Sequence, residues 1–358
     1  MNRASVAEGG ALGEASRLLE AWVETVGAFG ASAAVRAPGH DDLVVAAGID
    51  GRDPATPMPT DRSFWIGSVT KTFTSAVVLL LVEDGLLALD DTVDRFSTVF
   101  PRADEITIEM LLTHTSGVPD VLDGAGDEYA AMVFADLERV FTIDEAVVLA
   151  AALPPSGAPG AEYRYSNTGY LLLGSIIERV TSTNIVDVVA QRVLEPLELR
   201  DTYLDPRRRD ENLAHGWLTL DPNDPFGVDS LTFPHEAARS VAGTAGGMVS
   251  TLTDLLTWAT ALYGGTLSPP LRDELVASTR PPASPDGLHG YGVQRFDRVL
   301  AAGGEIELYG HMGNLPGASA IVLYFPETGV AVAAHANVQE VDDPQFVDLA
   351  LGLHALVT

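Results

Sequence analysis

Short apolar runs near both ends of the chain predict β-strands. Residues 32–37 and 43–49 are two such runs, and the turn-forming cluster PGHDD between them indicates a hairpin. Residues 291–297, 318–325 and 329–337 form a second group, with PETG as the tight connection between the last two. Two runs at one end and three at the other predict one antiparallel, five-stranded sheet assembled from both termini.

Helical periodicity predicts most of the remaining structure. The predicted helices are residues 11–29, 69–85, 106–114, 143–153, 168–182, 184–197, 251–265 and 344–357. Stretches rich in Pro, Gly and Asp at 119–127, 154–160, 221–227 and 281–290 are expected to be loops. The expected fold class is α+β: terminal helices flank a sheet lobe of residues 1–67 and 291–358, and a mostly helical lobe of residues 68–290 is inserted between them.

Composition and charge exclude several classes of function. The chain has 358 residues, of which 46% are hydrophobic and 20% charged, which is typical of a globular protein. A formal net charge of −29 disfavours partners such as nucleic acids and anionic membrane surfaces. The absence of cysteine excludes disulfides, cysteine-based zinc sites and thiol nucleophiles.

The N-terminal segment predicts where the protein acts. The first thirty residues lack the basic region followed by an apolar region that a secretory signal needs. The longest dense apolar run, AVVLLLV at 76–82, is too short to span a bilayer and indicates a buried helix. We therefore expect a cytoplasmic protein without membrane insertion, and the alternative is an exported protein whose signal has been removed.

The segment IGSVTKTF at 66–73 contains Lys71, the only lysine in the chain. Ser68 and Lys71 have the i, i+3 spacing that places two helical side chains on one face. Burial and the positive end of a helix dipole both favour a neutral amine, which a base for a serine nucleophile must be. Arginine cannot serve, because it keeps its proton in proteins. The alternative is that Ser68 is an N-cap and Lys71 a surface side chain.

Two further segments carry candidate chemistry. In AEYRYSNTGYLLLG, Tyr165 can relay a proton and Asn167 can bind a substrate carbonyl; the alternative is a packed tyrosine followed by a helix cap. In YGHMGNLPGASAIVLYF, His311 and Gly313 stand shortly before a strand, where main-chain donors are available for an oxyanion. The alternative there is an ordinary loop histidine.

These motifs, taken together, resemble the serine beta-lactamase and penicillin-binding-protein superfamily. The order of the motifs and their separations in the sequence, 97 residues from Ser68 to Tyr165 and 146 from Tyr165 to His311, are part of this resemblance. The stretches ITIEMLLTHTSGVPD and GTAGGMVSTLTDLLTWATAL are similar to its branch of class C beta-lactamases, D-alanyl-D-alanine carboxypeptidases and esterases. The resemblance covers about residues 30–340 and implies a beta-lactamase/transpeptidase-like fold with the active site at the junction of the two lobes.

The resemblance also implies roles for individual residues. Ser68 would be the acylated nucleophile, Lys71 its proton acceptor and Tyr165 a partner in the acid/base work. Asn167 would bind the acyl-side amide of the substrate, and His311 would tune Tyr165. His114 is expected to be structural, near the site but outside the chemistry, and no cofactor or metal is implied.

The third motif departs from the family pattern. The oxyanion hole would be the backbone N–H groups of Ser68 and Asn314, with Gly313 allowing close approach. Met312 stands where the family usually has a hydroxyl that helps bind a free carboxylate, and a thioether cannot donate that hydrogen bond. Esters, amides, thioesters and substrates with a blocked carboxylate therefore fit better than penicillins, although Arg295 is a candidate to compensate.

We therefore expect a serine hydrolase that forms an acyl-enzyme at Ser68 on an ester, an amide or a D-amino-acid peptide. The alternatives are an acyltransferase, a penicillin-binding-protein-type thioesterase or peptide cyclase, and a non-catalytic ligand-binding or sensor domain. The expected partner is a small-molecule or peptide substrate, and the sequence leaves the oligomeric state open. No Gly-x-Ser-x-Gly elbow occurs, and GTAGGMVS at 243–250 lacks the spacing of a phosphate loop.

Overall fold

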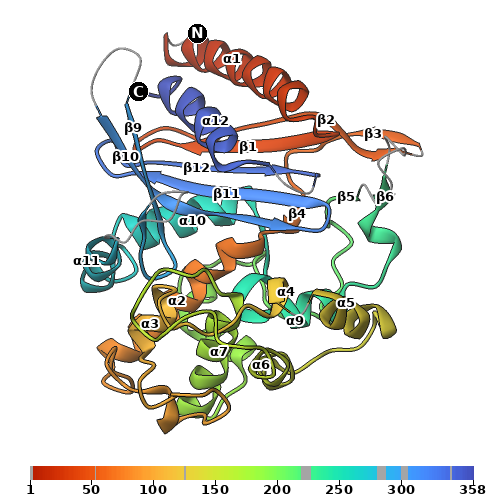
Figure 1. The fold of residues 1–358 in the computed structure, drawn as a ribbon. Helices are drawn as coiled ribbons and strands as arrows, with labels where there is room; N and C mark the ends of the chain where they lie inside the picture. Colours follow the sequence, from red (N-terminus) through yellow and green to blue (C-terminus); the bar gives the residue numbers. More distant parts are fainter. Residues whose placement is uncertain are drawn as a thin grey trace.

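The protein is organised around one antiparallel sheet, seen in a computed structural model that describes residues 3–52, 54–124, 126–218, 227–279, 288–299, 305–338 and 341–358 (Figure 1). Strand order across the sheet is β3-β2-β1-β12-β11-β10-β9-β8. The strands are β1 (Gly30–Arg36), β2 (Leu43–Arg52), β3 (Ala55–Pro57), β8 (Leu288–His289), β9 (Gln294–Val299), β10 (Glu305–Leu315), β11 (Ala318–Phe325) and β12 (Val330–Ala336). The N-terminal strand β1 pairs with the C-terminal strand β12, as a sheet built from both termini requires.

The expectation of five strands is wrong, because the sheet has eight. The missed strands are β3, β8 and β10. Strands β3 and β8 have only three and two residues, too few for a periodic signal. Strand β10 contains Gly310 and Gly313, and glycine lowers strand propensity. Backbone pairing with β9 on one side and β11 on the other nevertheless makes β10 a strand.

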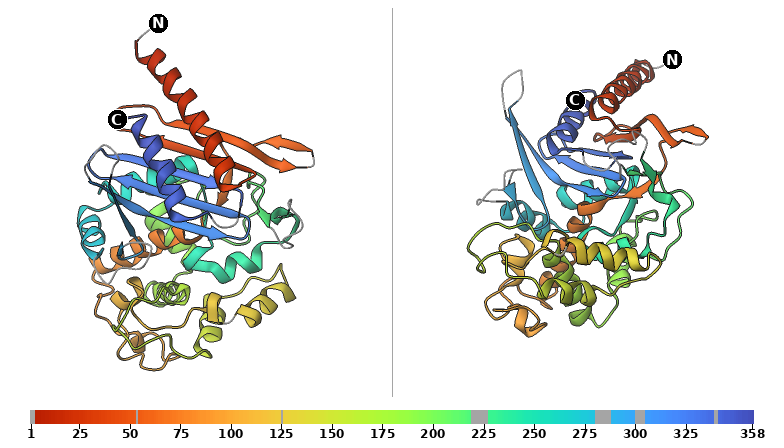
Figure 2. Two further views of the ribbon diagram at one scale, coloured as in Figure 1. Left: turned by 45° about the horizontal axis from the view of Figure 1, so that its top comes forward. Right: turned by 45° about the vertical axis from the view of Figure 1, so that its right-hand side comes forward.

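Alternate side chains of the strands pack into two hydrophobic cores, one on each face of the sheet. In β11, Ile321 and Leu323 pack into a core shared with α1 (Arg3–Val26) and α12 (Asp343–Ala355). Ala320 and Val322 face the larger core, which also contains α10 (Leu252–Tyr263). Figure 2 shows α1 and α12 together over one face of the sheet, with the other helices on the far side.

The larger core continues into the mostly helical part of the molecule. Besides α10, its helices are α2 (Thr70–Glu83), α3 (Ile108–Leu112), α4 (Val121–Gly124), α5 (Gly126–Ala135), α6 (Ile143–Ala151), α7 (Asn167–Thr181), α8 (Ile185–Val189), α9 (Glu236–Gly246) and α11 (Pro269–Ser278). Short β-ribbons join β4 (Ser63–Trp65) to β7 (Val249–Thr251) and β5 (Trp217–Leu218) to β6 (Val228–Asp229). All eight predicted helices overlap an observed one, whereas α4, α5, α9 and α11 were not predicted. The loop expected at 119–127 is wrong, because α4 and the start of α5 lie there. Most of the loops expected at 221–227 and 281–290 lie outside the described residues.

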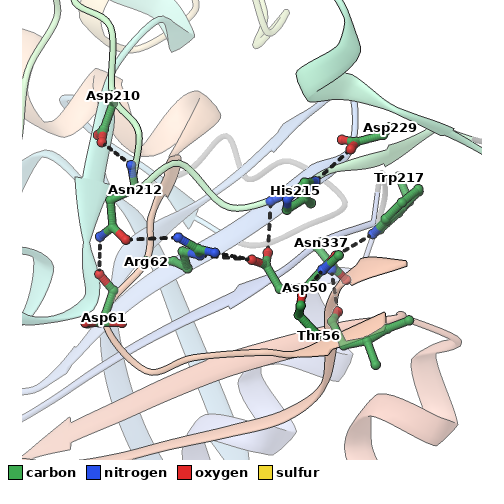
Figure 3. A network of polar contacts seen from close by, with 12 residues as sticks. Asp50, Thr56, Asp61, Arg62, Asp210, Asn212, His215, Trp217, Asp229 and Asn337 are labelled. Carbon is green, nitrogen blue, oxygen red and sulfur yellow. Dashed lines mark hydrogen bonds and ion pairs between the residues drawn. The ribbon is translucent and has the colours of Figure 1, made fainter. Parts of the chain in front are cut away.

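The buried carboxylate of Asp50, in β2, forms an ion pair with Arg62, before β4, and a hydrogen bond with the segment before β5 (Figure 3). Asp50 is fully buried, and its carboxylate accepts hydrogen bonds from Arg62 Nε at 2.9 Å and from the His215 backbone N–H at 2.9 Å. Arg62 NH2 completes the ion pair at 2.8 Å. The side chain of His215 is in turn held by Asp229, 2.6 Å from Nδ1. We call these four residues the Asp50 cluster.

Among the described residues, no helix is both long and apolar enough to cross a membrane.

Candidate active site

Ser68 stands at the turn that leads into α2, on the 3-10 helix η1 (Gly67–Val69). Neither η1 nor α2 uses Ser68 as its N-cap, so the alternative interpretation of this serine as a cap is wrong. Its Oγ lies 2.9 Å from Lys71 Nζ and 2.9 Å from the Tyr165 hydroxyl. Ser68 and Tyr165 are half-buried, whereas Lys71 is completely buried.

Lys71 is completely buried, which contradicts the alternative of a surface lysine. Its amine contacts three neutral groups: Ser68 Oγ, Asn167 Oδ1 at 2.7 Å and the Ala245 carbonyl at 2.8 Å. That carbonyl belongs to the last turn of α9, where backbone acceptors lack helical partners. Burial lowers the pKa of Lys71 from 10.5 to about 7, against an opposing effect of the Asp120 carboxylate. The amine can therefore lose and regain a proton near neutral pH.

Tyr165 reaches Ser68 from the loop that enters α7. Burial raises the pKa of its phenol well above 10, so the hydroxyl stays protonated and donates to Ser68 Oγ. Its ring stacks on His114, with ring centroids 4.3 Å apart. His114 is buried, has a left-handed backbone with φ of 56°, and accepts the Ser166 N–H at Nδ1. The histidine predicted to be structural thus contacts the tyrosine that bonds to Ser68.

Asn167 begins α7, directly after the N-cap Ser166. Its side chain bridges two charged residues: Oδ1 accepts from Lys71, and Nδ2 donates to Asp120 Oδ2 at 2.9 Å. The Asn167 backbone N–H also donates to that carboxylate oxygen, at 3.0 Å. Its predicted contact with a substrate amide stays a prediction, and the second N–H of its amide is the group that would make it.

The backbone of β10 runs against the turn that carries Ser68. A Cβ atom built on Gly313 would lie 2.5 Å from the Ser68 nitrogen, and one on Gly67 would lie 2.8 Å from the Asn314 nitrogen. Any side chain at either glycine would therefore collide with a backbone donor of the predicted oxyanion hole. The two glycines thus allow the backbones at Ser68 and Asn314 to pack closely, and the oxyanion hole itself stays a prediction.

His311 also comes from β10 and lies in a buried group of imidazoles. Its Nδ1 is 2.5 Å from the Met312 carbonyl, and its ring centroid is 6.4 Å from that of His289. Burial lowers the pKa of both histidines, to about 4 for His289, and Lys71 adds to the effect. The ring that stacks on Tyr165 is that of His114, so tuning of the tyrosine by His311 stays a prediction.

Met312 and Arg295, two of the predicted substrate contacts, are engaged elsewhere. The Met312 side chain packs against the core under α1 and α12, on the opposite face of β10 from His311. Arg295 binds Asp297 at 2.9 Å and Glu307 at 2.7 Å. The structure therefore brings Ser68, Lys71, Tyr165, Asn167, His311, Gly313 and Asn314 together, but not these two residues.

Asp120, His114, His289 and Ala245 are site residues that the sequence analysis missed or placed outside the chemistry. Asp120 lies within the stretch ITIEMLLTHTSGVPD, which contributed only to the resemblance. An aspartate before a short helix is common in turns and caps, so nothing in its local sequence indicates a site. Among the described residues, no group of three or more histidine, aspartate or glutamate side chains is placed to hold a metal ion.

The family model described as Beta-lactamase matches residues 15–356. Esterase EstB of Burkholderia gladioli is 38% identical over 165 residues, which cover 44% of this chain and 42% of the esterase. Penicillin-binding protein 4* of Bacillus subtilis is 28% identical over 325 residues, 84% of this chain and 66% of that protein. The matched segments thus span less than two thirds of these two curated relatives.

A solved structure covers nearly the whole chain. D-amino acid amidase from Ochrobactrum anthropi SV3, in complex with L-phenylalanine amide, superposes with a TM-score of 0.83 at 27% sequence identity. The superposition covers 97% of this chain and 98% of the amidase. The eight-stranded sheet and the helices below it are therefore an architecture that this chain shares with a structurally characterised protein.

Proposed function

Because the chain belongs to the beta-lactamase family, to which residues 15–356 match, we propose that it is a serine hydrolase acting through an acyl-enzyme at Ser68. One observation carries the proposal: Ser68 Oγ lies 2.9 Å from a fully buried amine and 2.9 Å from a protonated phenol. A nucleophile, a base with a pKa of about 7 and a proton donor are thereby in hydrogen-bond contact.

Acylation follows from the positions of these groups. As Ser68 Oγ bonds to the substrate carbonyl carbon, its proton passes to Lys71 Nζ. The N–H groups of Ser68 and Asn314 stabilise the negative charge that develops on the carbonyl oxygen. Tyr165 donates its proton to the departing alcohol or amine as that bond breaks, and the Lys71 proton restores the tyrosine. A water molecule then bonds to the acyl carbon, the ester bond to Ser68 Oγ breaks, and one water proton is transferred to Ser68 Oγ as the acid leaves.

Esters and amides are the proposed substrates, with D-amino acid amides included. The esterase and the D-amino acid amidase similar to this chain support this range. The Met312 side chain packs into the core on the opposite face of β10 from His311, so position 312 offers no hydroxyl for a free carboxylate, and we expect a penicillin to be a poorer acyl donor than an uncharged ester. Whether an amine accepts the acyl group in place of water is tested in the assay below.

Intact-mass analysis tests the proposal. The wild-type protein is incubated separately with p-nitrophenyl acetate, a fluorophosphonate and a penicillin, and Ser68→Ala serves as the matched control. We expect one fluorophosphonate adduct on Ser68, turnover of the ester, little penicillin adduct, and none of these with Ser68→Ala. Absence of any adduct or turnover in the wild type would refute the acyl-enzyme. Added alcohols or amines that divert the product from the free acid would identify an acyltransferase.

A further inference from the structure

We propose that Asp120 is a positioning residue that aims the lone pair of the Lys71 amine at the Ser68 hydroxyl by fixing which way the Asn167 amide points. The inference rests on the proposed acyl-transfer role of Ser68 and assigns a function to a carboxylate outside the predicted site. Asp120 is 9% exposed and lies 47 residues before Asn167 in the chain.

The first step concerns the orientation of the Asn167 amide. A carboxylate oxygen only accepts hydrogen bonds, so Asp120 Oδ2 selects the NH2 end of the amide. The carbonyl end must then face Lys71 Nζ, 2.7 Å away. In the flipped amide, two acceptors would meet at Asp120, which disfavours that arrangement, and an Asn167 N–H would compete with the Ser68 hydroxyl for the Lys71 lone pair.

The second step concerns the protons of Lys71. A neutral amine has two N–H groups and one lone pair. Asn167 Oδ1 and the Ala245 carbonyl can only accept, so they take the two N–H groups. The lone pair is left for the third neighbour, Ser68 Oγ at 2.9 Å, whose hydroxyl is able to donate. This is the orientation in which an amine removes the serine proton.

Asp120 is itself well held for this task. Its Oδ1 accepts the Leu122 N–H at 2.8 Å, while Oδ2 accepts both the backbone and side-chain N–H groups of Asn167. Its negative charge acts on Lys71 across the intervening amide and raises the pKa of the amine against the effect of burial. The carboxylate therefore influences both the direction of the lone pair and the proton affinity of the base.

The test uses p-nitrophenyl acetate, which has no charged group that Asp120 could bind directly. Asp120→Asn should lower kcat/KM by about 10- to 100-fold, because the Asn167 amide is free to turn. It should also move the acidic limb of the pH profile to lower pH, since the charge that raises the Lys71 pKa is gone. Asp120→Glu keeps the charge and should leave the limb near its wild-type position. If Asp120→Asn does not fold, Asp120→Ser replaces it with the same two expected results.

Thr168→Val is the matched control. Its hydroxyl accepts the Val121 N–H at 2.9 Å, so it links the same two segments as Asp120 and Asn167 without touching Lys71. This variant should lower the melting temperature but leave the acidic limb in place. The role of Asp120 would be overturned if Asp120→Asn had the wild-type kcat/KM and the wild-type acidic limb of the pH profile. It would also be overturned if Thr168→Val shifted the acidic limb by the same amount as Asp120→Asn. Absence of fluorophosphonate labelling in the wild type would instead refute the acyl-enzyme itself.

Discussion

The Asp50 cluster and the surroundings of Lys71 each bury a charged residue, but they compensate it differently. Asp50 is fully buried and bonds directly to the guanidinium of Arg62. Lys71 is equally buried, yet its three hydrogen-bond partners are neutral. The carboxylate that acts on its charge, Asp120, contacts the amide of Asn167.

This difference decides what each cluster can do. A carboxylate bonded to a guanidinium gains a charge partner that never loses its proton, so the Asp50 pair stabilises one arrangement of the fold. An amine held one amide away from a carboxylate receives less compensation, and burial brings its pKa to about 7. Direct contact between opposite charges, as in Asp50–Arg62, therefore gives a structural ion pair. Separation by one neutral side chain, as in Lys71–Asn167–Asp120, gives an amine that exchanges protons near neutral pH.

The largest expected effect comes from making the charge at position 71 permanent. Lys71→Arg should slow the acylation of Ser68 by about 10²- to 10⁴-fold, because the guanidinium cannot accept the serine proton. The rate is measured by fluorophosphonate labelling followed by intact mass. Lys71→Met, which removes the charge and the base together, should show a loss of similar size.

Folding of the Lys71 variants is checked by circular dichroism and thermal unfolding. If either variant folds like the wild type and labels at the wild-type rate, Lys71 is not the base.

An intermediate effect is expected from breaking the ion pair of the Asp50 cluster, which should lower the stability of the fold. Arg62→Met leaves Asp50 buried without its charged partner and should lower the free energy of unfolding by about 2–3 kcal/mol. The estimate is below that for a fully buried pair because the Arg62 side chain is 26% exposed. Urea denaturation measures the change. The labelling rate of the folded variant should equal that of the wild type; a large loss of labelling would mean that the two clusters are coupled.

The smallest expected effect is the pH dependence of the wild type. Below the Lys71 pKa of about 7 the amine is protonated in the fold and cannot act as a base. The rate of acylation should therefore fall about tenfold for each pH unit below that value, and level off above it. Arg62→Met should give the same profile. A rate that is constant between pH 5 and 8 would contradict a titrating amine in this step.

The strands show where sequence patterns succeed and where they fail. The terminal hairpin β1–β2 and the pair β11–β12 have apolar runs that predict them directly. Strand β10 was missed because glycines interrupt it, and those glycines are required by close contacts. A Cβ atom on Gly310 would lie 1.9 Å from the Val322 carbonyl oxygen, and one on Gly313 would lie 2.1 Å from that of Ile66. Close backbone packing, which a propensity does not include, thus determines these positions.

The sequence by itself determined which chemical groups are available. The only lysine stands three residues after Ser68, and this local spacing along a helix is enough to predict the contact between them. The roles predicted for Tyr165 and Gly313 came from the resemblance of their motifs to a family. In the structure, Tyr165 contacts the Ser68 hydroxyl and Gly313 lies against the Ser68 backbone.

Only the tertiary structure decided which groups surround the Lys71 amine. Asn167 lies 96 residues after Lys71 and Ala245 lies 174 residues after it, so no local pattern relates them. Asp120, which contacts Asn167, lies in yet another segment, just before α4. The direction of a lone pair depends on which neighbours can only accept a proton and from which side they approach. That information exists only once segments distant in the chain have packed around one amine.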